Sequence, residues 1–234
     1  MSDSFEQTRP VGCDVTARTD NAIRMVDIHP AIVAVLAPIL SLPSESDFPV
    51  ETDAVAASVE KRRHEFFAGR HLARIALARL GIANVAIPRN PDRTPQWPIG
   101  VKGSISHNDE FVMVAVTQSS EIAGLGIDLE AEASVDPSLR SLIQSDPCER
   151  PIDLTTLFSA KESVFKAVFP LCGEFLGHAD VTIINDQLHE VFAANSASYA
   201  RSARAMRNGT GQVLSMSGLV VTTFLLQHSE FTGA

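Results

Sequence analysis

The sequence has little cysteine, few aromatic residues and no long apolar run. Its three cysteines, Cys13, Cys148 and Cys172, are far apart and form neither a CxxC motif nor a metal-ligand spacing. They indicate reduced thiols in a cytoplasmic protein. The longest apolar run, near Ala31–Leu40, has about half of the ~20 residues that a membrane span needs, so we expect no span. We also expect no signal peptide, because MSDSFEQTRP has no basic segment leading into an apolar one.

The composition is that of a globular chain with excess negative charge. Hydrophobic residues make up 45% of the 234 residues, enough for one large domain or two small lobes. The net charge of −9 argues against general nucleic-acid binding, and we predict a monomer without a nucleic-acid partner. Positive charge is concentrated in residues 61–79, where Glu65 is the only acid. Such a patch can act locally within a negative molecule.

Two segments have the composition of long helices. Ala54–Leu80 contains no proline, carries apolar residues at helical spacing and is followed by Gly81, a typical helix-ending residue. Asp153–Phe169 has a second helical pattern, which we expect Pro170 to stop. Residues 1–20 are polar and aperiodic and predict a loose arm, and residues 41–53 predict a loop.

The remaining patterns favour strands. Phe111–Thr117 and Ile122–Glu130 predict two strands before the second helix. After it, we expect strands on either side of a tight turn at Asn185-Asp186, a short helix within Ala197–Arg207, and two strands around Ser217-Gly218.

The first motif with chemical potential is GIDLE at residues 126–130. Side chains alternate along a strand, so Asp128 and Glu130 face the same way, with Cα atoms roughly 6.5–7 Å apart. Two carboxylates on one face of an apolar strand repel one another, and a hard divalent cation with oxygen ligands would compensate. The alternative is an exposed strand end with two solvated acids.

The second motif is LFSAKESVFKAVFP at residues 157–170. Glu162 and Lys166 are four residues apart and share one helix face. Two structural interpretations compete with catalysis: a surface salt bridge between these residues, or a capping box formed by Ser159 and Glu162.

The third motif is GSISH at residues 103–107, which we expect to form a loop before a strand. Gly103 permits close approach of the backbone, and Ser104, Ser106 and His107 offer hydrogen bonds. A phosphate would suit such a loop. An ordinary polar turn is the alternative.

Taken in order, these motifs resemble those of the Sfp-type 4′-phosphopantetheinyl transferases, particularly the EntD-like and PptT-like subgroup. KRRHEFFAGRHLARIALARLG at 61–81 resembles the basic helix of that subgroup, and RTPQWPIGVKGSISH at 93–107 resembles its segment leading into a Ser-His motif. GIDLE and FSAKESVFKA resemble its metal and Lys-Glu-x-x-x-Lys motifs. The resemblance covers roughly residues 55–183, with Asn108 standing where many relatives have cysteine.

The resemblance implies an α+β fold of two lobes related by a pseudo-twofold axis. Each lobe would pair a small antiparallel sheet with a long helix, and the active site would lie between the lobes. We place the N-terminal lobe at residues 21–125 and the C-terminal lobe at 126–234, after the arm at 1–20.

The resemblance also implies an activity: transfer of 4′-phosphopantetheine from coenzyme A to a serine of an acyl, peptidyl or aryl carrier protein, with release of 3′,5′-ADP. Siderophore, nonribosomal peptide and polyketide synthesis are all possible pathways. The implied magnesium ligands are Asp128, Glu130 and Glu162, and the implied catalytic residues are Glu162 and Lys166. The implied coenzyme A contacts are Arg62, Arg70, Arg93, Ser106, His107, Lys161 and Lys166.

Two other functions stay open from the sequence. A metal-dependent phosphohydrolase of nucleotide pyrophosphates would use the same carboxylates, and a non-catalytic coenzyme A-binding module would keep the fold. We interpret four other histidines as solvated or satisfied side chains: His64, His71, His178 and His189.

Overall fold

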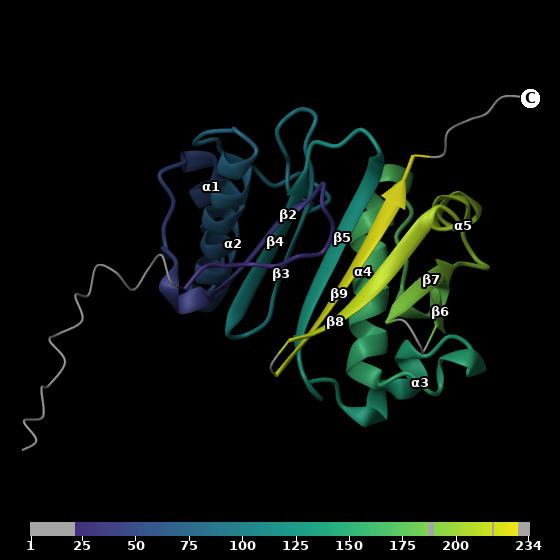
Figure 1. Ribbon diagram of the computed structural model, residues 1–234. Helices are drawn as coiled ribbons and strands as arrows, with labels where there is room; N and C mark the ends of the chain where they lie inside the picture. The colour runs from purple at the N-terminus through teal and green to yellow at the C-terminus, as the bar shows by residue number, and fades with distance from the viewer. Residues whose placement is uncertain (1–21, 187–189, 217, 229–234) are drawn as a thin grey trace, which may run out of the picture.

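The computed structural model describes residues 22–186, 190–216 and 218–228, so the predicted arm at 1–20 lies outside the described residues. The described chain forms two antiparallel sheets with helices, which confirms the α+β class (Figure 1). The first sheet has the order β1 (Arg24–Met25), β2 (Val33–Pro38), β4 (Phe111–Thr117), β3 (Lys102–His107). The second has the order β5 (Ile122–Ala131), β9 (Leu219–Gln227), β8 (Gly209–Met216), β7 (Val191–Asn195), β6 (Thr182–Asp186).

Two long helices accompany the sheets. The α-helices are α1 (Pro49–Ala54), α2 (Glu60–Arg79), α3 (Arg140–Ile143), α4 (Leu154–Cys172) and α5 (Ala200–Met206). Short 3-10 helices are η2 (Ile39–Ser41), η3 (Pro137–Leu139), η4 (Pro147–Glu149) and η5 (His178–Asp180). We call the first sheet with α1 and α2 the first lobe, and the second sheet with α3, α4 and α5 the second lobe.

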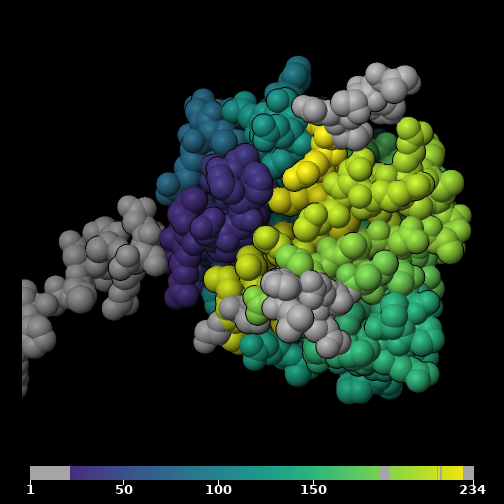
Figure 2. Space-filling model, turned by 45° about the vertical axis from the view of Figure 1, so that its right-hand side comes forward, coloured from purple at the N-terminus to yellow at the C-terminus, as the bar shows by residue number. Residues whose placement is uncertain are grey.

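Side-chain alternation in the central strands decides how these layers stack. In β4, Val112, Val114 and Val116 pack into the core beneath α2, whereas Met113 and Ala115 pack into a core shared with β5 and β9. A third core lies between the second sheet and α4. The order of layers is therefore helix, sheet, sheet, helix. Figure 2 shows the segment that carries β2 (purple) directly against the yellow strands β8 and β9, as the shared core requires.

A glycine of the GIDLE motif sets the distance between β5 and α4. A Cβ atom on Gly126 would lie 1.9 Å from the carbonyl oxygen of Ser163 and 2.7 Å from the amide nitrogen of Ala167. Only glycine fits at this separation. The helix thus lies directly on the strand, which brings Lys166 of α4 to Asp128 of β5.

Both predicted helices exist, with different bounds. The first begins at Glu60 rather than Ala54, and residues 49–53 of the predicted loop form α1 together with Ala54. The buried carboxylate of Glu51, which binds Arg74 of α2 at 2.7 Å, fixes α1 by a tertiary contact that sequence periodicity does not show.

Pro170 does not stop the second helix, contrary to our prediction. It lies inside the last turn of α4, where its missing N–H costs one hydrogen bond. The helix ends instead at Gly173, whose φ of +66° is the left-handed conformation typical of a helix C-terminus.

The GSISH segment is a strand rather than a loop. Residues 102–107 form β3 and pair with residues 112–117 of β4, from Lys102 opposite Thr117 to His107 opposite Val112. The predicted turn at Asn185-Asp186 is also wrong, since both residues pair with β7 as part of β6. The other predicted strands and the short helix α5 are confirmed.

The proposed division after residue 125 stays a prediction. The hydrogen bonds of β5 assign the whole strand, from Ile122, to the second sheet. Among the described residues, no helix is both long enough and apolar enough to cross a membrane.

Candidate active site

A cleft of about 620 Å³ lies between the two lobes. The first lobe contributes the N-terminal half of α2, the end of β3 and the loop that follows α2, while the second contributes β5 and α4. Nine of the ten predicted site residues line this cleft: Arg62, Arg70, Arg93, Ser106, His107, Asp128, Glu130, Glu162 and Lys166.

β3 joins the lobes through its two serines. Their side chains project toward β5, because residues 104 and 106 share one face of the strand. The Ser104 hydroxyl accepts a hydrogen bond from the amide of Ile127 at 3.1 Å, and the Ser106 hydroxyl donates to Oδ1 of Asp128 at 2.9 Å. The Ser-His motif therefore helps to fix the carboxylate of the metal motif.

Asp128 lies at the centre of the cleft and is buried. Its Oδ1 accepts a hydrogen bond from the ammonium of Lys166 at 2.6 Å and another from the Ser106 hydroxyl. Its Oδ2 is buried and has no hydrogen-bond partner among the described residues. An oxygen of a buried carboxylate without a donor needs a compensating charge, because desolvation is otherwise costly.

Two further carboxylates flank Asp128. Burial raises the pKa of Glu130, and the negative charges of Asp128 and Glu162 raise it further, while Ser134 and Lys166 act in the opposite direction. The Ser134 hydroxyl donates to Glu130 at 3.2 Å, and Nε2 of His178 lies 3.1 Å from Oε1 of Glu162. The three acids repel one another, and each is also held by another partner.

The cationic wall is built around Arg62 and His107. Nη1 of Arg62 lies 2.8 Å from Nε2 of His107, and the Glu65 carboxylate lies 3.2 Å from Arg62 and 3.7 Å from His107. Burial lowers the pKa of His107, with smaller contributions from Arg62 and Lys166 in the same direction, while Glu65 raises it. When His107 is neutral, its Nε2 can accept a hydrogen bond from Arg62. An anion bound beside it would favour the protonated form of His107, because a negative charge stabilises the imidazolium.

Arg70 and Arg93 occupy different settings. Arg70 is buried, donates from Nε to the carbonyl oxygen of Ile87 at 2.7 Å and stacks on Phe66, and burial lowers its pKa to about 10. Arg93 has a left-handed φ of +72° in a turn closed by Asp92 and Thr94. Arg70 is thus part of the wall, whereas Arg93 stands on a constrained loop beside the cleft.

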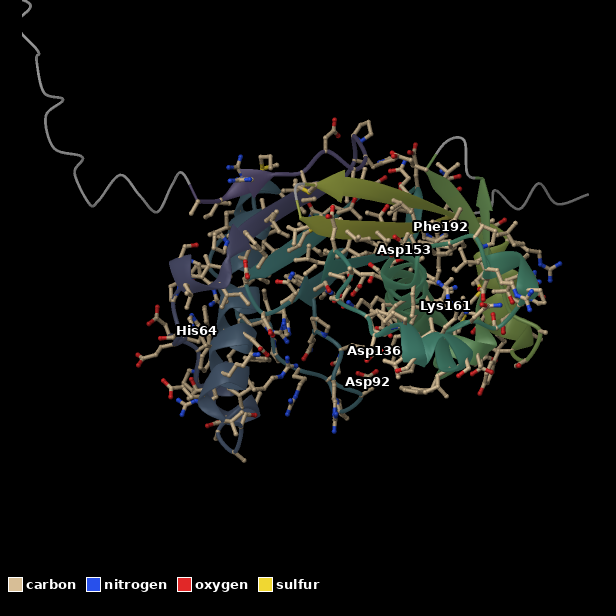
Figure 3. The ribbon with its side chains drawn as sticks, turned by 90° about the horizontal axis from the view of Figure 1, so that it is seen from below. His64, Asp92, Asp136, Asp153, Lys161 and Phe192 are labelled. Atoms are coloured by element: carbon tan, nitrogen blue, oxygen red, sulfur yellow. The ribbon has the colours of Figure 1, made fainter. Side chains whose placement is uncertain are left out.

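Lys161 is the exception, and our prediction of a phosphate contact is wrong for it. Its ammonium is buried inside the second lobe, where Figure 3 shows it beside α4 and away from His64 on α2. It donates to Glu149, to Ser145 and to the carbonyl oxygens of Ile143 and His178, at distances of 2.7–3.1 Å. These contacts use its donors in the interior, so none is directed at the cleft.

Both structural alternatives for residues 157–170 are excluded. The helix is capped by Asp153, which accepts from the amide of Thr156, so Ser159 lies inside the helix rather than at its start. Lys166 donates to Asp128 on β5 and to Ser106 on β3, so it does not form the surface salt bridge with Glu162 that the alternative requires.

Sequence reasoning missed four residues of this site: Glu65, Arg89, Phe158 and His178. Glu65, Arg89 and Phe158 line the cleft, and His178 contacts Glu162 from beyond the end of α4. Glu65 was visible as the only acid in a basic helix. The contact of His178 with Glu162 could not be predicted from neighbouring residues. It depends on the chain folding back after α4, so that the His178 ring stacks on Phe158 with 4.9 Å between centroids.

The carboxylates are chemically suited to magnesium, which prefers hard oxygen ligands. The partnerless Oδ2 of Asp128 and the mutual repulsion recorded at Glu130 fit a bound cation. Within the described ranges, however, no three His, Cys, Asp or Glu side chains are arranged closely enough to hold a metal ion. Glu130 at Ser134 and Glu162 at His178 would have to turn toward Asp128 to bind one ion together.

A second cleft of about 590 Å³ adjoins the first and shares Arg93, Pro95, Ile105 and Lys166 with it. Its lining is mainly apolar. The apolar side chains include Trp97, Phe165, Phe169 and Phe175. Trp97 packs against β3, where a Cβ atom on Gly103 would lie 2.7 Å from the indole ring, so the glycine makes room for the ring rather than for a ligand.

Comparison with protein families identifies the class to which this fold and site belong. The 4′-phosphopantetheinyl transferase N-terminal domain matches residues 50–117, and the 4′-phosphopantetheinyl transferase superfamily matches residues 124–210. Together these matches cover about two thirds of the chain and include every lining residue of the charged cleft. The chain therefore belongs to the 4′-phosphopantetheinyl transferase superfamily.

Individual relatives support the EntD-like and PptT-like subgroup. The chain is 38% identical over 144 residues to the 4′-phosphopantetheinyl transferase Npt of Nocardia iowensis, covering 58% of this chain and 64% of that protein. It is 36% identical over 151 residues to PptT of Mycobacterium tuberculosis, covering 60% and 66%. It is 36% identical over 119 residues to enterobactin synthase component D of Escherichia coli K12, covering 46% and 55%. The chain thus spans less than two thirds of the length of these relatives.

Proposed function

We propose that this chain transfers the 4′-phosphopantetheine group of coenzyme A to a serine of a carrier-protein domain. The observation that carries the proposal is one cleft with a cationic wall from the first lobe, centred on Arg62 and His107, facing three carboxylates of the second. Coenzyme A has a 3′-phosphate and a pyrophosphate, which suit these two halves. Relatives that share the family are named as 4′-phosphopantetheinyl transferases.

The reaction is a displacement at phosphorus. The serine hydroxyl oxygen of the carrier attacks the phosphorus that bears the pantetheine arm, and the bond from that phosphorus to the bridging pyrophosphate oxygen breaks. 3′,5′-ADP leaves with the electron pair, and the serine proton passes to a base. Catalysis of this kind depends on positioning and on neutralising the charge of the leaving group.

We assign the binding roles by position in the cleft. Arg62 and His107 hold the 3′-phosphate, which would relieve the direct contact of the two basic groups at 2.8 Å. Lys166 binds a pyrophosphate oxygen, close to the Ser106 hydroxyl that already accepts from it. Arg93 contacts the nucleotide phosphates or adenine from its loop, and Arg70 supports this wall through its stacking on Phe66.

We assign the reacting roles to the second lobe. Asp128, Glu130 and Glu162 hold magnesium, which when bound supplies charge neutralisation for the pyrophosphate and the departing ADP. Glu162 is our choice of general base, since it reaches the cleft from α4 beside Lys166. The pantetheine arm extends into the adjoining apolar cleft beside Phe165 and Phe175.

The acceptor is an acyl, peptidyl or aryl carrier domain. Several relatives are named enterobactin synthase component D, which favours a siderophore carrier, with nonribosomal peptide and polyketide carriers as further classes. We place the enzyme in the cytoplasm as a monomer without nucleic-acid partners. Carrier domains are usually acidic, so docking should be salt-sensitive and act mainly on the association rate.

The test is incubation with coenzyme A, magnesium chloride and a panel of apo carrier domains. Mass spectrometry should find a gain of about 340 Da on the acceptor serine, the mass of the transferred group. A carrier with that serine replaced by alanine is the control. The absence of any gain on every carrier class would overturn the proposal.

The same experiment separates the alternatives. A phosphohydrolase would release 3′,5′-ADP from coenzyme A when no carrier is present. A binding module would take up coenzyme A in isothermal titration without modifying any carrier.

A further inference from the structure

His178 contacts Glu162 from outside the cleft lining. Its Nε2 is 3.1 Å from Oε1 of Glu162, and both side chains are about one third exposed (32% and 30%). This nitrogen is buried and meets no hydrogen-bond angle with any described residue. The separation is that of a hydrogen bond although the hydrogen-bond geometry is not met, so the carboxylate and the ring must reorient relative to each other to complete the bond.

The imidazole of His178 is fixed from two sides. Its ring stacks on Phe158 of α4, with 4.9 Å between centroids and 25° between planes. Its backbone carbonyl accepts from the ammonium of Lys161 at 3.0 Å. The turn that carries it is closed by Asp180, whose carboxylate accepts from the amide of Gly177 at 2.9 Å.

Two consecutive residues of α4, Lys161 and Glu162, therefore contact His178, one at its backbone and the other at its ring. Lys161 points inward and holds the main chain of His178, while Glu162 points to the cleft and meets its ring. Lys161 is itself anchored by the wholly buried Glu149. The position of the His178 ring is thus fixed by contacts in the interior of the second lobe.

We propose that His178 is a positioning residue that orients the Glu162 carboxylate. A glutamate has several rotamers, and a partner on one oxygen limits them and leaves the other oxygen available to a cation. Carboxylates that hold metal ions are themselves commonly hydrogen-bonded, and removal of such a partner typically weakens metal binding about 10–100-fold. This inference rests on the proposed function, because it assigns Glu162 to the metal.

The test is a manganese titration followed by electron paramagnetic resonance of the free ion, with coenzyme A present. His178→Phe keeps a ring to stack on Phe158 and removes the nitrogen, and it should raise the Kd for manganese about 10–100-fold. His178→Gln returns an amide donor and should recover most of the affinity. His228→Phe is the matched control, since His228 is exposed, and it should leave the Kd unchanged.

Turnover gives a second readout. In His178→Phe the concentration of magnesium needed for half-maximal transfer should rise by the same factor, while kcat at saturating magnesium stays within a few-fold of wild type. Thermal melting checks that each variant is folded. If His178→Phe has a lower melting temperature than the wild type, a second variant replaces it. Phe158→Leu leaves His178 in place but removes the ring on which it stacks, and it should also weaken manganese binding.

Three results would overturn the inference. An unchanged manganese Kd in a folded His178→Phe would show that the ring is a bystander. A tighter Kd would show that His178 draws Glu162 away from the ion. A His178→Gln variant as weak as His178→Phe would remove the role of the donor. In each case an active wild type leaves the proposed function standing, whereas a wild type that binds no manganese and modifies no carrier overturns that function itself.

Discussion

Among the described residues, each lobe contains one wholly buried glutamate that binds a basic side chain of the long helix, a serine hydroxyl and at least one backbone amide. Glu51 accepts from Arg74 on the long helix of its lobe, from the amide of Ile87 at 2.8 Å and from the Ser46 hydroxyl. Glu149 accepts from Lys161 on the long helix of the second lobe. Its other donors are the amide of Ile183 at 2.7 Å, the amide and hydroxyl of Ser145, and the amide of Asp146 at 3.2 Å.

The two ion pairs differ in what lies next to them. The Arg74 side chain is 13% exposed, whereas the Lys161 side chain is 1% exposed and directly precedes Glu162, which lines the charged cleft. Burial lowers the pKa of Lys161, while hydrogen bonding to Glu149 and its charge raise it. Both ion pairs thus stabilise their lobes, and the one in the second lobe also adjoins the carboxylate that we propose as the general base.

The largest expected difference between the lobes is catalytic. Glu162→Gln should lower turnover about 10²–10⁴-fold, the usual contribution of a general base. Manganese affinity should fall much less. Steady-state transfer assays and a manganese titration measure both.

Glu65→Gln is the control for this comparison, because it removes a carboxylate of the same cleft that belongs to the first lobe. It should change the KM for coenzyme A more than kcat. If Glu162→Gln lost turnover and metal affinity equally, Glu162 would be a ligand and not the base.

The next effect is on stability and compares the two ion pairs directly. Glu149→Gln leaves the ammonium of Lys161 buried without a carboxylate and should cost about 3–5 kcal/mol. Glu51→Gln should cost less, about 1–3 kcal/mol, because Arg74 is partly exposed and can turn toward water. Urea unfolding gives both free energies.

The pairs should also differ in function. Under conditions where both variants are folded, Glu149→Gln should reduce transfer and Glu51→Gln should not. Equal stability losses with equal activities would show that the two glutamates are equivalent, against the comparison drawn above.

A third comparison concerns the helix–strand approach in each lobe. Gly126→Ala would force β5 away from a backbone oxygen of α4 and should cost about 1–3 kcal/mol, as overpacking does. In Gly69→Ala of α2 the new Cβ would lie 3.2 Å from a methyl group of Ile105, which can yield. The gain in helix propensity, about 1 kcal/mol, should offset that contact.

Thermal denaturation of both alanine variants measures this contrast. A loss for Gly69→Ala as large as that for Gly126→Ala would mean that the two interfaces are equally tight. Manganese affinity should fall only in Gly126→Ala, because only that strand carries Asp128.

The smallest effect is the pH dependence contributed by His107. Burial lowers its pKa in the folded state, so the unfolded state binds more protons as pH falls below the ordinary value near 6.5. The free energy of unfolding should therefore decrease with falling pH in that window and level off below the folded pKa. His107→Gln should remove this slope, which cannot exceed about 1.4 kcal/mol per pH unit for one proton.

Urea unfolding at several pH values between about 5 and 7.5 measures the slope. His64→Gln, which changes a histidine of α2 that does not line the charged cleft, should retain it. A slope unchanged in His107→Gln would assign the titration to another group.

The sequence predicted the elements that local patterning controls. Period-two alternation located β4 and β5. The two acids of GIDLE and Glu162 of the Lys-Glu-x-x-x-Lys motif line the cleft, as expected. These predictions succeed because spacing along a strand or helix determines which side chains share a face.

The failures depend on contacts between distant segments. Lys161 has the sequence setting of a site residue, but it turns inward because Glu149, twelve residues earlier, offers a buried carboxylate. α1 exists because Glu51 reaches Arg74 and Ile87, and His178 acquires a role only when the chain returns to Phe158. Neither helical nor strand periodicity relates the members of these pairs.

Trp97 gives the molecule a built-in optical probe. It is the only tryptophan in the sequence, and its indole rests on Gly103 at the wall of the apolar cleft. Emission excited near 295 nm, a wavelength absorbed by indole, therefore comes from a single point beside β3. Any molecule that enters this cleft changes the surroundings of that one ring, so occupancy can be followed in real time without a label.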